Sequence, residues 1–454
     1  SHLSGDLHIT NPGIWSLLPD TIFLNVKELI EDGLDLKGKS LGVTRITSTK
    51  DLDSLTTSLS MVISLVSKET SQEVVMDGLV SLLSKHSKDI SDLEIRLANA
   101  FSTASTSSKY GKSPTLVSFL VQLGSDTKII KTILSAYKEH VKITPIPKIG
   151  LIIDYEKGKI TDVSDVLSEI IALGGQILFT KEQTSNKGVL RVDIKNAGTT
   201  SIKLQSLSIN LPRLAFESNK DETYFRARLA LLMKPALSSM SLRKKDISDL
   251  TRRGLNPILA SNTQYMQRGS VSLVINLVGL HEAVFNILGH ESNKEGKDIL
   301  YKVIDTAVSV AKKKGKETGD TINVCMIESE GSNRFATLDG EKYGKTSVLK
   351  TLNGESYSEG IVFDAGEISG FSAKSDKIVE CNKMAKMLDG GLLAKIKFSK
   401  DAKADEIKTI IEKASDLLSS FKPVKKVAIC GNCGLKDEKL GDKCPKCKSP
   451  YIIN

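Results

Sequence analysis

The chain has 454 residues, of which 40% are hydrophobic and 26% are charged, and its formal net charge is +9. These totals are typical of a soluble globular protein with one large domain and a small appendage, or with two to three ordinary domains. No run of about 18 or more apolar residues occurs, which predicts no membrane-spanning helix and no membrane partner. The basic excess is compatible with a polyanionic partner but is too mild to require one.

The first 140 residues are predicted to be mainly helical. A first helix is expected at 25–32, where Gly33 closes it. Asp51 can cap the next helix, whose apolar side chains recur with a period of 3.6 residues. Four further helices are expected at about 72–85, from Asp92, from Pro114 and at about 128–140.

After Pro145 and Pro147 the pattern changes to short apolar strands that alternate with longer helices. This alternation predicts an α/β body with mostly buried parallel strands. The expected strands are 150–154, 176–179, 206–210, 271–277 and 322–327. The expected helices are 163–173, 221–234, 244–253, 280–288, 295–314 and 405–421. The chain is accordingly divided into three parts, 1–140, 141–422 and 423–454.

Two Cys-x-x-Cys pairs lie near the C-terminus, Cys430 with Cys433 and Cys444 with Cys447. Four thiolates in two such pairs form a tetrahedral cage for a structural Zn²⁺ ion, so a zinc ribbon is predicted over 423–454. Disulfides or a redox dithiol are the alternatives, although a redox Cys-x-x-Cys usually occurs singly beside a βαβ pattern. A ribbon with few other cysteines suits a reducing compartment, and a cytoplasmic location is expected.

Lysines are concentrated around these cysteines. Between Phe421 and Pro450 there are eight lysines and three acidic residues. Such a surface would suit contact with RNA or a ribosome, and simple solubility is the alternative explanation. The candidate polyanion contacts are Lys425, Lys426, Lys443, Lys446 and Lys448.

A series of different short motifs lies along the chain between residue 2 and residue 447. They are the segment His2-Leu-Ser-Gly-Asp-Leu-His8, the loop 108–114, the turn 145–147, Ile209-Asn-Leu-Pro212-Arg213, the stretch 274–283, Glu330-Gly-Ser-Asn-Arg334-Phe, the stretch 388–391 and the cysteine pairs. In this order they resemble the anaerobic, glycyl-radical ribonucleoside-triphosphate reductases.

The resemblance implies a ten-stranded α/β barrel of two antiparallel halves. Residues 1–140 would be the mainly helical part of the barrel domain, 141–422 the remainder of the barrel and 423–454 the zinc ribbon. A substrate or nucleotide pocket is also implied, for which the candidate residues are His8, Ser108, Gly111, Arg213 and Arg334.

The chain departs from that family at the atoms that its radical chemistry uses. In the family, a glycyl radical generates a thiyl radical on a finger-loop cysteine, which removes a hydrogen atom from the ribose. The corresponding segment here is 191–204, and it contains no cysteine. Segment 19–27, where many members carry a second thiol, also contains none.

Few groups remain that could replace this thiol. Cys325 lies inside an apolar strand and is interpreted as core packing. Glu330 is either a carboxylate close to the ribose, as the resemblance implies, or an ordinary acid at the end of a loop. His8 is expected to be structural, and Arg213 to hold a phosphate or to pair with an acid. No role is assigned to Cys381.

The sequence therefore favours a catalytically inactive homologue that acts as a binding protein, with nucleic acid, a ribosome or a nucleotide as its ligand. The alternative is a genuine anaerobic ribonucleoside-triphosphate reductase that uses other thiols or a partner chain. In that case Glu330 and Cys325 are the weak catalytic candidates. A homodimer formed through the helices, as in the family, is a further expectation.

Overall fold

The structure is a computed structural model of the chain. It describes residues 1–31, 33–36, 45–49, 51–86, 90–106, 115–144, 147–155, 160–181, 202–261, 271–289, 294–349, 356–436 and 440–453. The loop 108–114 with Ser108 and Gly111, residues 145–146 of the predicted turn and most of the segment 191–204 lie outside these residues.

Five parallel strands form the first half of a barrel, and each pairs with the next in chain order. They are β2 (Thr21–Asn25), β5 (Glu73–Asp77), β6 (Leu116–Gln122), β7 (Ile149–Asp154) and β8 (Gln176–Thr180). In β7, Leu151 and Ile153 pack in the large core shared with the helices, whereas Ile152 joins a separate cluster inside the barrel. Both faces of the sheet are therefore buried.

The second half is built from β9 (Ile202–Asn210), β10 (Val271–Val278), β11 (Thr321–Met326), β13 (Gly391–Leu392), β14 (Ala394–Phe398) and β15 (Ser420–Lys425). These strands are parallel to one another, and the short β12 (Ile361–Asp364) lies beside β14. The two halves meet in antiparallel pairs, β2 with β9 and β8 with β15.

The sheet closes on itself at Leu393. The hydrogen-bonded path of strands begins at β12 and β14 and ends at β13, and a single residue separates β13 from β14 in the chain. When β13 and β14 are counted as one interrupted strand and β12 is set aside, ten strands surround the interior. The predicted ten-stranded α/β barrel of two antiparallel halves is thus confirmed.

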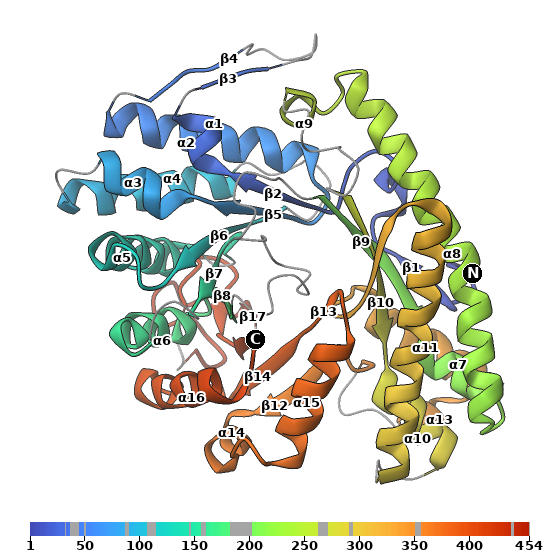
Figure 1. Cartoon of the computed structure of the whole chain (residues 1–454). Coiled ribbons are helices and arrows are strands. Elements are labelled where there is room, and N and C mark those ends of the chain that lie inside the picture. The colour runs from blue at the N-terminus through green and yellow to red at the C-terminus, as the bar shows by residue number, and fades with distance from the viewer. Residues whose placement is uncertain are drawn as a thin grey trace.

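Helices cover the outside of the barrel (Figure 1). Around the first half lie α1 (Val26–Ile30), α2 (Leu52–Glu69), α3 (Leu79–His86), α4 (Ile90–Thr106), α5 (Thr127–Ile143) and α6 (Ser164–Ala172). Around the second half lie α7 (Leu211–Glu217), α8 (Glu222–Arg252), α9 (Pro257–Ser261), α10 (Leu280–Leu288), α11 (Lys294–Thr318), α12 (Gly331–Tyr343), α13 (Lys345–Leu349), α14 (Ala365–Gly370), α15 (Asp376–Met387) and α16 (Ala404–Leu417).

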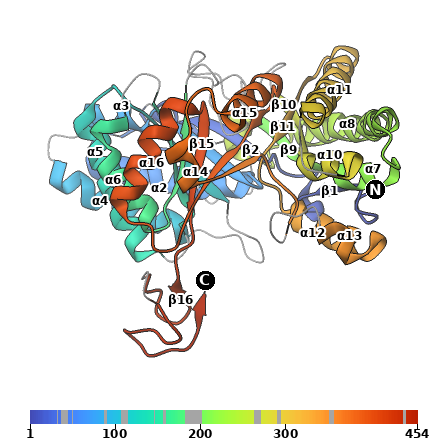
Figure 2. The ribbon, with the colours of Figure 1, turned by 90° about the horizontal axis from the view of Figure 1, so that it is seen from below.

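The remaining elements are short. β1 (Leu7–Ile9) pairs antiparallel with β9, and a 3₁₀ turn, Pro12–Ile14, follows it. A second 3₁₀ turn, Ile160–Asp162, precedes α6. β3 (Leu34–Asp35) pairs with β4 (Arg45–Ile46), and in the C-terminal ribbon β16 (Ile429–Cys430) pairs with β17 (Ile452–Ile453). Figure 2 shows the ribbon projecting from one side of the barrel.

The predicted helix that begins at Pro114 is wrong, and the predicted helix at about 72–85 is correct only from Leu79, where α3 begins. Residues 73–77 form β5 and residues 116–122 form β6, so the first 140 residues contribute three barrel strands. The apolar side chains Val75 and Leu79 are spaced as on a helix, but Gly78, with φ of 82°, ends the strand between them. Short apolar runs fit either periodicity, and burial in the barrel decides the outcome.

The predicted boundaries at 234–244 and 421 are also wrong. α8 runs without a break from Glu222 to Arg252 through Pro235, because Met233, Leu237 and Met240 are buried on its inner face. Such burial offsets the cost of an internal proline, which is about 3 kcal/mol. At the other boundary α16 ends at Leu417, and Phe421 belongs to β15.

Candidate functional site

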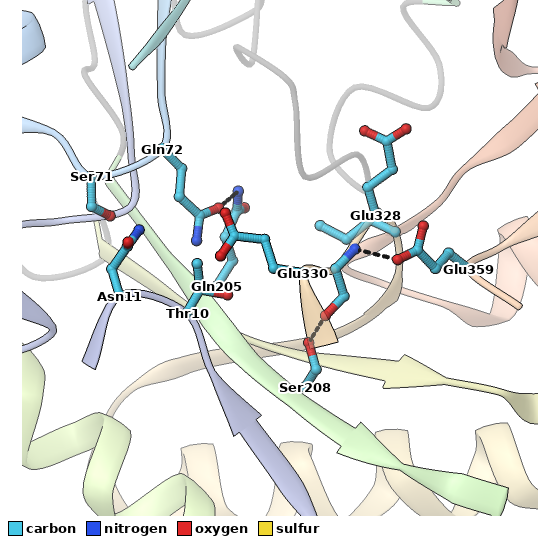
Figure 3. A pocket seen from close by; sticks show the side chains of 11 residues that line it. Thr10, Asn11, Ser71, Gln72, Gln205, Ser208, Glu328, Glu330 and Glu359 are labelled. Carbon is cyan, nitrogen blue, oxygen red and sulfur yellow. Dashed lines mark hydrogen bonds between the residues drawn. The ribbon is translucent and has the colours of Figure 1, made fainter. Parts of the chain in front are cut away.

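A polar cavity of about 380 Å³ opens where the two halves of the barrel meet. The first half contributes residues that precede β5, and the second contributes residues of β9 and of the segment that follows β11. The lining residues are Thr10, Asn11, Ser71, Gln72, Gln205, Ser208, Ile327, Glu328, Ser329, Glu330 and Glu359 (Figure 3). Ten of these eleven side chains can form hydrogen bonds, so the cavity suits a ligand rich in polar groups.

One wall of the cavity carries a chain of alternating charges. Lys395 Nζ lies 3.2 Å from Glu328 and 3.0 Å from Glu359, and Lys422 Nζ lies 3.1 Å from Glu328. Burial opposes ionisation of Glu328, but the two lysines outweigh it and lower the pKa of this carboxyl to about 2. Two lysines therefore balance two carboxylates on this wall.

Glu330 supplies a further carboxylate, which pairs with neither Lys395 nor Lys422. It lies just before α12, and its side chain forms no hydrogen bond or ion pair with another described residue. Figure 3 shows the side chain extending into the cavity toward Gln72 and Gln205. The carboxylate is therefore available to accept hydrogen bonds from a ligand.

A further carboxyl, that of Glu73, lies inside the barrel. Glu73 is the first residue of β5 and is 6% exposed, and Ser118 Oγ donates a hydrogen bond to it at 2.5 Å. Burial raises the pKa of Glu73 to about 7, although the Ser118 hydrogen bond and Lys422 act in the opposite direction. The barrel interior thus holds a carboxyl that titrates near neutral pH.

Neither of the two cysteines outside the ribbon lines the cavity. Cys325 lies on β11 and packs against Val274 and Ile327 on the inner side of the sheet. Cys381 lies on α15, within the core that the helices share. Burial raises the pKa of both thiols, that of Cys381 to about 12. Both are therefore protonated and enclosed at neutral pH.

Three of the predicted pocket residues are described by the structure, and none of them lines the cavity. Arg213 is 2% exposed, and its Nε donates to Asp339 at 2.6 Å. His8 lies on β1, opposite Ser208, and is 9% exposed. Arg334 lies on α12 and donates to the carbonyl oxygen of His2 at 2.6 Å. Ser108 and Gly111 fall outside the described residues.

The four cysteines of the ribbon form a compact cluster. Their sulfur atoms all lie within 4.8 Å of one another. Cys430 Sγ is 3.5 Å from Cys447 Sγ, and Cys433 Sγ is 3.6 Å from Cys444 Sγ. Sulfur atoms at about 2.3 Å from a tetrahedral ion are about 3.8 Å apart, so the cluster fits a thiolate-bound metal. Among the described residues this is the only such group.

Lysines of the C-terminal region have two different environments. Lys436 Nζ donates to the carbonyl oxygens of Val141 at 2.9 Å and Leu173 at 3.3 Å, at the ends of α5 and α6. Lys425 is buried, and its Nζ donates to the carbonyl oxygen of Ala172. Lys436 thus holds the ribbon against the barrel, whereas Lys425, at the end of β15, ties that strand to α6. Exposed side chains remain at Lys426, Lys443, Lys446 and Lys448.

Sequence reasoning missed the lysines and two carboxylates of the cavity wall. Glu328 stands two residues before Glu330, and Glu359 precedes β12. The alternation Ala394-Lys-Ile-Lys-Phe398 was a usable signal, because it indicates a strand whose lysines face one side. Lysine inside a barrel is unusual, however, and the positions of Glu328 and Glu359 explain it.

The closed barrel, the cavity at the meeting of its two halves and the cysteine cluster together define a protein of the ribonucleotide reductase type. The model of the family described as anaerobic ribonucleoside-triphosphate reductase matches residues 148–453, which is more than half of the chain. The chain therefore belongs to the anaerobic ribonucleoside-triphosphate reductase family.

Individual relatives are distant. An anaerobic ribonucleoside-triphosphate reductase of Haemophilus influenzae is 27% identical over 161 residues, which are 30% of this chain and 22% of that protein. The match thus spans less than a quarter of the length of this curated relative.

Solved structures show the same fold. The anaerobic ribonucleotide reductase from Thermotoga maritima with dATP bound in the specificity site has a TM-score of 0.73 at 15% identity, covering 100% of this chain and 82% of that one. The same enzyme in complex with dATP and CTP has a TM-score of 0.72 at 16% identity, covering 99% and 81%. Hydroxyproline dehydratase from Clostridioides difficile has a TM-score of 0.60 at 11% identity, covering 84% and 62%.

No helix in the described part of the chain is both long enough and apolar enough to cross a lipid bilayer.

Proposed function

We propose that this chain is a catalytically inactive member of its family that binds a nucleotide in the barrel cavity. The observation that carries the proposal is the composition of the cavity wall, which offers carboxylates, amides and hydroxyls and, among its described residues, no thiol. A Thermotoga maritima relative has been solved in complex with dATP and CTP. A cavity of about 380 Å³ has the size of a small-molecule site.

The absence of reductase activity is inferred from the chemistry of hydrogen abstraction. The family resemblance implies a thiyl radical in the segment that corresponds to residues 191–204, and these residues contain no cysteine. Carboxylates such as Glu330 can accept or donate protons but do not form the radical that removes a hydrogen atom from carbon. Cys325 is enclosed, so it does not reach a ligand in the cavity.

The charges favour a sugar rather than a phosphate in this cavity. Lys395 and Lys422 are already engaged by Glu328 and Glu359, which leaves Glu330 as a carboxylate that no described cation neutralises. A phosphate beside Glu330 would be repelled, whereas a ribose hydroxyl can donate a hydrogen bond to it. The sugar of the nucleotide is therefore proposed to lie in the cavity, with its phosphates outside.

Isothermal titration calorimetry of the full chain with CTP and with cytidine tests this proposal. Both ligands are expected to bind saturably, and Glu330→Gln should weaken both by about tenfold, the effect of about 1.4 kcal/mol. Glu341→Gln on the exposed surface of α12 is the matched control and should bind like the wild type. The proposal fails if neither ligand binds, or if both substitutions act alike.

The metal of the ribbon is proposed to be Zn²⁺, because four thiolates in a closed cluster are typical of structural zinc. Elemental analysis of the purified chain should find about one zinc ion per chain, held by Cys430, Cys433, Cys444 and Cys447. Loss of the ion after Cys444→Ser, and its retention after Cys381→Ser, would support this assignment. Equal zinc content in both variants would refute it.

RNA is a second candidate ligand, favoured by the ribbon. Lys426, Lys443, Lys446 and Lys448 are exposed, and none of them forms an ion pair with a described residue. Replacing the last three by glutamine should weaken RNA binding and reduce its salt dependence. Replacing the exposed Lys312, Lys313 and Lys316 of α11 removes the same charge elsewhere and is the matched control. Binding that both triple variants weaken equally would indicate attraction by net charge alone.

A further inference from the structure

Helix α8 carries a row of apolar side chains on the face that points away from the barrel. Tyr224, Leu231 and Leu242 are 49%, 60% and 64% exposed, and Pro235 is exposed as well. We call these four residues the α8 stripe. Figures 1 and 2 both show α8 at the outer edge of the second half of the barrel. The stripe is therefore a surface that a partner can cover.

The spacing of the α8 stripe is that of a seam between two helices. Its side chains follow one another at intervals of 7, 4 and 7 residues, at positions 224, 231, 235 and 242. Such intervals keep one narrow face of a helix, because two turns take about seven residues. Two helices with this spacing pack along their length at a crossing angle of about 20°. Lys234 flanks the stripe at its centre and can extend from the seam into water.

The α8 stripe matches itself when it is read in the opposite direction. Tyr224 and Leu242 each lie nine residues from Met233, and Leu231 and Pro235 each lie two residues from it. In an antiparallel pair of α8 helices centred at Met233, Tyr224 of one copy therefore faces Leu242 of the other. Leu231 faces Pro235 in the same way. A twofold axis at this point gives both copies the same contacts, as a symmetric dimer interface requires.

Charges at the two ends of α8 favour the antiparallel direction. Asp221 and Glu222 stand at the amino end, whereas Lys244 and Lys245 stand toward the carboxyl end. Asp221 and Lys245 each lie twelve residues from Met233, so the antiparallel pair brings opposite charges together at both ends. Both side chains are exposed, and neither forms an ion pair with another described residue. A parallel pair would instead place like charges opposite each other.

We propose that two copies of this chain associate through the α8 stripe, with their α8 helices antiparallel about a twofold axis at Met233. The partner is a second copy, because both the apolar side chains and the end charges of α8 are complementary to α8 itself. A contact of one helix from each copy is expected at the lower end of specific interfaces, about 1,200 Å² in total. The dissociation constant is accordingly expected on the order of 10 µM. The stripe lies outside the barrel, so the dimer does not depend on nucleotide binding in the cavity.

Sedimentation velocity of the full chain tests the association, over concentrations from about 1 to about 100 µM. The wild type should change from monomer to dimer across this range. Leu231→Glu places a charge at the centre of the stripe and should weaken the association by at least about tenfold. The variant should fold normally, because this side chain is exposed. Ile95→Glu makes the same change at a similarly exposed residue of α4 and should associate as the wild type does.

Cross-linking with a short bismaleimide tests the direction of the pair. A mixture of Tyr224→Cys and Leu242→Cys chains should be joined into dimers, because these two positions face each other in the antiparallel pair. Tyr224→Cys alone should not be joined, since its two copies would lie 18 residues apart along the helix axis, which is about 27 Å. The wild type is the reference, because its own cysteines are buried or belong to the ribbon cluster.

Three results would overturn the proposal. A wild type that stays monomeric at every concentration would show that the stripe does not pair with itself. A dimer that Ile95→Glu disrupts and Leu231→Glu leaves intact would place the contact on another face. Cross-linking of Tyr224→Cys to its own copy, without cross-linking to Leu242→Cys, would refute the antiparallel direction. Calorimetry with cytidine would report separately on the cavity in each case.

Discussion

The thiol of Cys325 donates to Asn276 across two neighbouring strands, with Cys325 Sγ 3.5 Å from Asn276 Oδ1. The same amide oxygen accepts a hydrogen bond from Ile327 N at 2.9 Å, and Asn276 Nδ2 donates to Ile327 O. Asn276 thus joins β10 to the end of β11 and holds the thiol in place. The only sulfur on the inner side of the described barrel strands is therefore a packed, hydrogen-bonded group.

Cysteine alkylation should reflect this enclosure. Cys325 is 0% exposed and Cys381 is 3% exposed, and burial raises the pKa of both thiols. Since the thiolate is the reactive form, iodoacetamide at about pH 8 should modify neither in the folded protein and both in urea. Mass spectrometry of tryptic peptides measures this. Rapid modification of native Cys325 would show that the thiol is accessible and would reopen a catalytic role.

A buried ion pair is expected to dominate the stability of the N-terminal segment. Arg243 donates to Asp20 at 2.7 Å and 2.8 Å, and both side chains are 1% exposed or less. Asp20→Asn should lower the free energy of unfolding by about 3–5 kcal/mol, because it leaves a buried guanidinium group uncompensated. Asp35→Asn, which removes an exposed partner of Arg45, should cost about 1 kcal/mol or less. Urea unfolding at neutral pH compares them.

The ion pair of Arg243 and Asp20 should also make the free energy of unfolding depend on pH. Burial opposes ionisation of Asp20, but Arg243 outweighs it, and the folded-state pKa lies below the usual value. A depressed pKa contributes stability that is complete above the unfolded-state pKa and is lost as the pH falls toward the folded-state pKa. The difference in unfolding free energy between wild type and Asp20→Asn should therefore shrink below about pH 4. A difference that grows on acidification would contradict this assignment.

Glu73 should make the stability of the protein depend on pH in the opposite direction. Its folded-state pKa of about 7 lies above the ordinary value of 4.5, so the folded protein retains a proton that the unfolded chain loses. Stability should consequently fall by about 3 kcal/mol as the pH rises from about 4.5 to about 7. Glu73→Gln should remove this fall, and Glu406→Gln on the surface of α16 should not. Equal slopes in all three proteins would show that Glu73 titrates normally.

Removal of the metal should loosen the ribbon alone. The barrel has its own large core, whereas the ribbon core consists mainly of the four cysteines and their neighbours. A chelator should therefore increase hydrogen exchange in residues 427–453 and leave the barrel strands protected. Cooperative unfolding of β7 and β10 in the same treatment would show that the two parts are one folding unit.

The features that could be predicted from the sequence are those that a short stretch of residues determines by itself. The cysteine spacing places four ligands without knowledge of the fold, and the helix 280–288 coincides with α10 because Gly279 and Gly289 bound it. The ordered series of motifs from His2 to Cys447, which includes those at Arg213 and Arg334, indicates the barrel. Each of these signals is local and does not depend on a partner distant in the chain.

The features that were missed depend on distant partners. β5 and β15 are recognisable only from their neighbours in the sheet, since their sequences fit a helix or a connection equally well. The balance of charge on the cavity wall joins Glu328, in the segment after β11, to Lys395 on β14 and Lys422 on β15. The structural role of Arg213 also depends on a distant partner, because Asp339, with which it pairs, lies 126 residues further along the chain.

The most direct test of the central claim is an anoxic assay of the full chain with CTP, a glycyl-radical activating enzyme and dithiothreitol. The account predicts saturable CTP binding without formation of dCTP above the background of the activating enzyme alone. Formation of dCTP that disappears in Cys325→Ala would contradict it, since a sulfur atom that we describe as enclosed would then be carrying out the reduction.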